Sequence, residues 1–139
     1  GRKSAFGAMG QINDYMCLDG TIPVSSLPFV LKRIKELSDQ FGLKVGNVFH
    51  AGDGNMHPLI LFDANKPGDL ELCEEFGAEI LKLCVEVGGC LTGEHGVGIE
   101  KRDLMHVQYA PDDLEAQMAV KDVFEPAWLL NPAKVFPAE

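Results

Sequence analysis

The sequence lacks several features that would place it in a common class of proteins. No run of apolar residues approaches the roughly 18 that a membrane-spanning helix needs, and no signal peptide is recognisable. Basic runs are absent too, because 12 Lys and Arg stand against 21 Asp and Glu, for a net charge of −9. A surface for binding nucleic acid is therefore not expected.

Short metal, redox and nucleotide motifs are also missing. None of the four cysteines is spaced as C-x-x-C, which argues against a zinc knuckle and against a redox dithiol. Cys73 and Cys84 are 11 residues apart, close to one helical face, and we expect them to be buried thiols in a reducing compartment. The glycine-rich loops match neither the P-loop nor the dinucleotide fingerprint, so no nucleotide-binding unit is recognisable in this chain.

Length and composition predict one domain over residues 1–139. A chain of 139 residues, 46% apolar and 24% charged, is ordinary for a globular protein and buries about two-thirds of its unfolded surface. It begins at Gly1 without an initiator Met. We therefore expect a fragment or processed piece of a longer protein.

Two helices are predicted from apolar residues at helical spacing. The first follows two serines (25–26) that suit an N-cap and ends at Gly42, which suits a C-cap. Its predicted buried stripe consists of Val30, Ile34, Leu37 and Phe41. The second is capped by Asp69 and stops at Gly88-Gly89. Its predicted stripe consists of Leu72, Cys73, Phe76, Ile80, Leu83, Cys84 and Val87.

The remaining segments predict strands and a C-terminal extension. Strands are expected at residues 15–24, 43–50, 56–62 and 90–92, after an irregular glycine-containing segment, with Pro58 at an edge or an irregular strand start. The order strand, helix, strand, strand, helix, strand predicts an α+β fold. It is the order of a ferredoxin-like antiparallel sheet with helices on one face, here over residues 25–95. Residues 99–139 are predicted to add a helical C-terminal extension that ends in an apolar tail.

Two glycine-rich loops carry the candidate chemistry. His50 and His57 flank a Gly-Asp-Gly-Asn turn, and Glu94 and His95 lie between glycines. Two imidazoles and one carboxylate suit a divalent ion such as zinc, iron or manganese, with positions left open for a substrate. A histidine kept neutral by a nearby cation suits a general base, the role expected of His95. The simpler interpretation, in which these histidines only form hydrogen bonds in loops, stays open because a single H-x6-H pair is a weak pattern.

Three motifs in order resemble a known family. They are His-Ala-Gly-Asp-Gly-Asn-Met-His (50–57), Gly-Gly-Cys-Leu-Thr-Gly-Glu-His-Gly-Val-Gly-Ile-Glu-Lys-Arg (88–102) and Leu-Leu-Asn-Pro-Ala-Lys-Val (129–135). Together they resemble the C-terminal domain of FAD-linked oxidases, which are vanillyl-alcohol-oxidase-type flavoproteins. Within that family the resemblance is to the glycolate oxidase FAD subunit and to the D-lactate and D-2-hydroxyglutarate dehydrogenases, and it spans essentially the whole chain.

The resemblance implies roles for six residues. The family's metal ligands fall on His50, His57 and Glu94, and its catalytic base falls on His95. Arg2 matches the arginine that binds the substrate carboxylate, and Asn131 matches a residue that approaches the flavin. The implied reaction oxidises glycolate or D-lactate to the 2-oxo acid, with hydride transfer to FAD.

Departures from the family pattern refine this expectation. The polar residues that contact substrate in the 2-hydroxyglutarate relatives are replaced by Phe6, Cys17 and Leu59. An apolar lining favours a small monocarboxylate such as glycolate or lactate. The family's FAD-binding domain would precede this segment, so we expect the isolated fragment to bind FAD weakly and to be inactive.

The resemblance also implies partners and a location. The expected partners are a small 2-hydroxy acid, the FAD-binding domain of the parent chain, and either further oxidase subunits or a second copy. The expected location is the bacterial cytoplasm, either free or peripheral to the membrane in a complex. The alternative function is a non-catalytic ferredoxin-like module for binding or dimerisation. A metallohydrolase is disfavoured because the tail around Asn131 would then have no role.

Overall fold

The computed structural model describes residues 2–50 and 52–137, with side chains from Ser4 onward. The chain divides into two compact units, Gly1–Glu94 and His95–Glu139, and each is considered by itself. The first unit contains α1 (Arg2–Gly10), β1 (Asp14–Cys17), β2 (Gly20–Thr21), the 3-10 turn η1 (Val24–Ser26), α2 (Leu27–Phe41), β3 (Val45–His50), β4 (Asn55–Phe62) and α3 (Asp69–Glu86). The second contains η2 (Arg102–Leu104), α4 (Met105–Gln108) and α5 (Pro111–Phe124).

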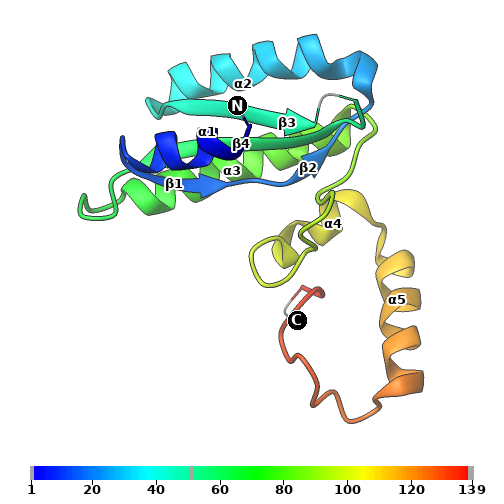
Figure 1. Cartoon of the computed structure of the whole chain (residues 1–139). Helices are drawn as coiled ribbons and strands as arrows, with labels where there is room; N and C mark the ends of the chain where they lie inside the picture. The colour runs from blue at the N-terminus through cyan, green and yellow to red at the C-terminus, as the bar shows by residue number, and fades with distance from the viewer. Residues whose placement is uncertain (1, 51, 138–139) are drawn as a thin grey trace. The chain divides into compact units, whose positions relative to one another are not determined.

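The sheet of the first unit is built around β4 (Figure 1). On one side β4 pairs antiparallel with β3, from Val45↔Ile60 to His50↔Asn55. On the other side it pairs antiparallel with β1 and β2. An isolated antiparallel bridge, Thr21↔Cys90, follows on the outer side of β2. This order is the one expected of the split β-α-β arrangement, and the predicted α+β class is confirmed.

Two strand predictions differ from the structure. The strand expected at 15–24 is divided into β1 and β2, and the strand expected at 90–92 is reduced to the bridge at Cys90. Pro58 was expected at an edge or an irregular start, yet it lies inside the central strand, opposite Asn47 of β3. A proline cannot donate a ladder hydrogen bond, and the β1–β2 strand is interrupted beside it, at Leu18 and Asp19.

One face of the sheet packs against α2 and α3. Val30, Ile34 and Leu37 of α2 are buried as predicted, and Gly42 ends the helix with φ 70°. The rings of Phe41 and Phe76 stack with centroids 5.2 Å apart. The predicted Asp69 cap is wrong by one residue, because Gly68 is the N-cap and Asp69 is the first helical residue. The buried core consists of Leu18, Ile22, Val30, Ile34, Leu37, Leu43, Met56, Ile60, Cys73, Phe76, Ile80, Leu83 and Cys84.

A helix lies at the N-terminus, where an irregular segment was expected. Met9 of α1 packs where a side chain at Gly46 would stand, and Gly10 lies against the Tyr15 ring. Val45 belongs to the periphery of the α2–α3 core, so its neighbour Gly46 faces the other side of the sheet. This tertiary packing on the second face outweighs the low helix propensity of the glycines in this segment.

The second unit contains the helical segments η2, α4 and α5. Helix α5 begins with Pro111 in its first turn and ends before Pro126. The Lys121 ammonium lies 4.3 Å from the ring centroid of Trp128 and donates to Leu130 O at 3.0 Å. These contacts tie the following segment back to the helix. Within the described residues, none of the helices has both the length and the apolar character to cross a membrane.

Candidate metal centre

The β3–β4 hairpin places two histidines on one face of the sheet. His50 pairs with Asn55 across the hairpin, and His57 is two residues beyond Asn55, so all three share a face. The two imidazole centroids are 5.8 Å apart. Gly54 has φ 79°, and a Cβ there would lie 2.1 Å from Ile22 O. Only glycine fits this close approach of the start of β4 to the backbone of Ile22.

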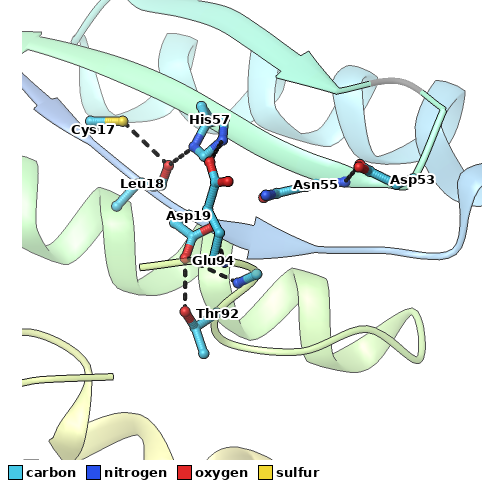
Figure 2. A network of polar contacts seen from close by, with 9 residues as sticks. Cys17, Leu18, Asp19, Asp53, Asn55, His57, Thr92 and Glu94 are labelled. Carbon is cyan, nitrogen blue, oxygen red and sulfur yellow. Dashed lines mark hydrogen bonds and ion pairs between the residues drawn. The ribbon is translucent and has the colours of Figure 1, made fainter. Parts of the chain in front are cut away.

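The orientation of the buried His57 ring follows from Pro58. Leu18 N donates to Pro58 O at 3.0 Å, but Pro58 has no N–H with which to return the bond. Leu18 O therefore receives no ladder bond from Pro58. It accepts from the Cys17 thiol at 3.5 Å and lies 3.2 Å from His57 Nδ1 (Figure 2). Since a carbonyl only accepts, Nδ1 carries the proton and donates to Leu18 O. The other ring nitrogen, Nε2, then faces Glu94.

Glu94 reaches the histidines from a loop outside the hairpin. Its Oε1 lies 2.9 Å from His57 Nε2. Its side chain is 49% exposed, whereas that of His57 is 2% exposed. Packing therefore restrains His57 far more than Glu94, and the place of Glu94 depends on its backbone.

Two side chains of the sheet hold that backbone. Asp19 is fully buried and accepts from Thr92 Oγ1 at 2.7 Å, Gly93 N at 3.0 Å and Glu94 N at 3.1 Å (Figure 2). Asn55 packs against Gly93 so closely that a Cβ at Gly93 would lie 2.6 Å from Asn55 Oδ1. The loop is thus anchored by Asp19 and limited in its approach by Asn55.

The residues fit a divalent cation. His50, His57 and Glu94 each offer one ligand atom, and the three atoms all lie within 4.8 Å of one another. Ligand atoms about 2.1 Å from one ion in tetrahedral directions are roughly 3.4 Å apart, so small side-chain rotations suffice. Asn55 Oδ1 is buried without a hydrogen-bond partner in the described part of the chain, and its side chain points toward the His57–Glu94 pair (Figure 2). It is an available acceptor beside the cluster.

The other predicted site residues are less closely defined. His95 is exposed and begins the second unit, and Asn131 is exposed in the tail of that unit with φ 48°. The side chain of Arg2 falls outside the described residues. Leu59 and Cys17 form a cross-strand pair on the face that carries His57, and Leu59 is fully buried.

Sequence reasoning missed Asp19, Asn55 and the role of Pro58. The available signal for Asp19 was a carboxylate inside an apolar stretch, because a buried charge requires donors. Nothing along the chain indicated that its donors are Thr92, Gly93 and Glu94, more than 70 residues away.

Comparison with known proteins adds independent information. Residues 1–135 match the family model described as FAD linked oxidases, C-terminal domain. The chain is 58% identical over 138 residues to glycolate oxidase subunit GlcD of Escherichia coli (strain K12), which covers 99% of this chain and 28% of that protein. It is 34% identical over 118 residues to the mitochondrial D-lactate dehydrogenase [cytochrome] of Kluyveromyces lactis, and this match covers 85% of this chain and 20% of that protein. It is 35% identical over 128 residues to D-2-hydroxyglutarate dehydrogenase of Stutzerimonas stutzeri, and this match covers 86% of this chain and 27% of that protein. The chain therefore spans less than a third of the length of these relatives.

Proposed function

This chain belongs to the family of C-terminal domains of FAD-linked oxidases, and on that premise we propose that it is the substrate- and metal-binding domain of a flavin-dependent 2-hydroxy-acid dehydrogenase. The proposed reaction of the whole protein converts glycolate or D-lactate to the 2-oxo acid and passes hydride to FAD. The relatives named as glycolate oxidase and D-lactate dehydrogenase support this reaction class.

The surroundings of His57 carry the metal part of the proposal. Both nitrogens of this buried imidazole face oxygen acceptors, the Leu18 carbonyl at Nδ1 and the Glu94 carboxylate at Nε2. A neutral imidazole can donate to only one of them, which leaves the lone pair of its unprotonated nitrogen opposed to a carboxylate oxygen. A cation shared by Nε2 and Glu94 removes that repulsion, and His50 supplies a further nitrogen beside it.

The protein residues then have distinct tasks. His50, His57 and Glu94 hold zinc, iron or manganese, and they leave coordination positions open. When bound, such an ion supplies positive charge that lowers the pKa of a hydroxyl, and FAD supplies a hydride acceptor. Arg2 binds the substrate carboxylate, His95 takes the hydroxyl proton, and Asn131 contacts the flavin.

The size of the substrate is a further part of the proposal. Leu59, which is fully buried, and Cys17 make the surroundings of His57 apolar, and Phe6 contributes a third apolar side chain from α1. An unpaired second carboxylate is disfavoured in such surroundings, so a small monocarboxylate such as glycolate or lactate is preferred over 2-hydroxyglutarate. We propose that most contacts to FAD come from another part of the parent protein, and that this chain alone is therefore inactive.

Metal content tests the proposal directly. The purified 139-residue chain is reconstituted with zinc, manganese or ferrous iron, desalted and analysed by mass spectrometry. We expect about one ion per chain in the wild type and in His106→Ala, whose histidine is exposed on α4, and little in His50→Ala or Glu94→Ala. Equal metal content in all four proteins, or none in the wild type, would favour the non-catalytic binding or dimerisation module.

A further inference from the structure

We propose that Asp19 is a positioning residue that sets the place of Glu94 and thereby the affinity of the site for its metal ion. This inference rests on the proposed function, because it concerns the same three ligands. Asp19 is separated from Glu94 by 75 residues of sequence, and its contact with the ligand is to the backbone.

The Asp19 carboxylate holds one short loop. Three consecutive residues donate to it, through the Thr92 hydroxyl and the backbone N–H groups of Gly93 and Glu94. Glu94 N lies 3.2 Å from Oδ1 and 3.1 Å from Oδ2, so it is shared by both oxygens. Backbone N–H bonds to an ionised carboxylate are strong, and a buried carboxylate is tolerated only when its oxygens are bonded in this way.

Position in the sheet connects this anchor to the metal ligands. Asp19 lies between the pairs Cys17↔Leu59 and Gly20↔Met56, which places it across from His57 on the neighbouring strand. Residues opposite each other on paired strands share a face, so Asp19 holds the loop beside the His57 ring. Asp19, which anchors the loop of Glu94, and the metal ligand His57 therefore occupy facing positions on neighbouring strands.

Packing restrains the Glu94 side chain less than it restrains its anchor. Its side chain is half exposed, whereas Asp19 has no exposed surface. Asp19 is not one of the clustered ligand residues, and its oxygens are occupied by loop donors. Hydrogen bonds that orient a metal ligand typically change metal affinity by about 10- to 100-fold when they are removed.

The test compares two buried aspartates that each hold a loop. Asp19→Asn keeps the size of the side chain but turns an NH2 group toward N–H donors. Asp69→Asn is the matched control, because Asp69 is also buried and accepts from the backbone N–H of Asp63 at 2.8 Å. For each variant we would measure zinc affinity by chelator competition, the visible spectrum of bound cobalt, and urea unfolding of the metal-free protein.

We expect Asp19→Asn to weaken zinc binding about 10- to 100-fold and to alter the cobalt spectrum. Asp69→Asn should lower stability but keep zinc affinity within about twofold. Thr92→Val removes one donor to Asp19 at nearly constant volume, and it should weaken zinc binding severalfold even if Asp19→Asn does not fold.

Several results would overturn the inference. Wild-type affinity in both Asp19→Asn and Thr92→Val, together with loss of zinc from Glu94→Ala, would refute the role of Asp19 while leaving the metal site intact. An equal loss of affinity in Asp69→Asn would show that destabilisation alone explains the effect. A wild-type protein that binds none of zinc, manganese and ferrous iron, or a Glu94→Ala variant that binds metal normally, would overturn the proposed function and this inference with it.

Discussion

Gly93 provides a sharp test of how the loop that carries Glu94 meets the sheet. A methyl group added at Gly93 would lie 2.6 Å from Oδ1, 2.7 Å from Cγ and 2.9 Å from Nδ2 of Asn55. Ordinary contact begins at 3.4 Å, so Asn55 or the loop must move by about 0.8 Å. Asn55 is 8% exposed and has little room to yield, so we expect Gly93→Ala to destabilise the metal-free protein by about 1–3 kcal/mol.

Gly7→Ala is the matched control, because it adds the same methyl group at a position where that group contacts no neighbouring atom. A Cβ at Gly7 meets no atom within 4 Å, and Gly7 lies in α1, so Gly7→Ala should stabilise by roughly 0.5–1 kcal/mol. Urea unfolding followed by circular dichroism measures both variants.

A double-mutant cycle then identifies the contact. Asn55→Ala removes the three atoms that the new methyl group meets, so Gly93→Ala should be much less destabilising in that background. The coupling free energy should be about 1 kcal/mol or more. A Gly93→Ala variant as stable as the wild type, or a coupling near zero, would refute this account of the loop.

Two further predictions concern the sheet and the loop before α3. Pro58→Ala supplies an N–H that competes with His57 Nδ1 for Leu18 O, so zinc affinity should fall severalfold in chelator competition. Unchanged affinity would contradict the proposed origin of the ring orientation. The Asp63 backbone N–H lowers the pKa of the Asp69 carboxyl below its ordinary value of 3.8, so the carboxylate stabilises the fold at higher pH, and this contribution is lost as the pH falls through and below that value. Urea unfolding between about pH 5 and pH 2.5 should show a shallower loss of stability for Asp69→Asn than for the wild type, and parallel curves would contradict the assignment.

Local sequence determined helices α2 and α3 and the β3–β4 hairpin. The apolar spacing and the C-capping glycine of α2, and the glycine turn between β3 and β4, act over a few residues. The order of these elements was also sufficient to predict the α+β class and the arrangement of its strands. The ligand candidates were recognisable for a related reason, since His50, His57 and Glu94 belong to compact, glycine-flanked motifs.

Contacts between distant segments decided the rest. The glycines of α1 argue against a helix until the second face of the sheet is present to pack against Met9. Beside the central Pro58, the His57 imidazole and the Cys17 thiol bond the Leu18 carbonyl that receives no ladder bond from the proline. Asp19 acquires its donors when residues 92–94 reach the sheet. Such pairings depend on which segments become neighbours in space, and no periodicity along the chain encodes that.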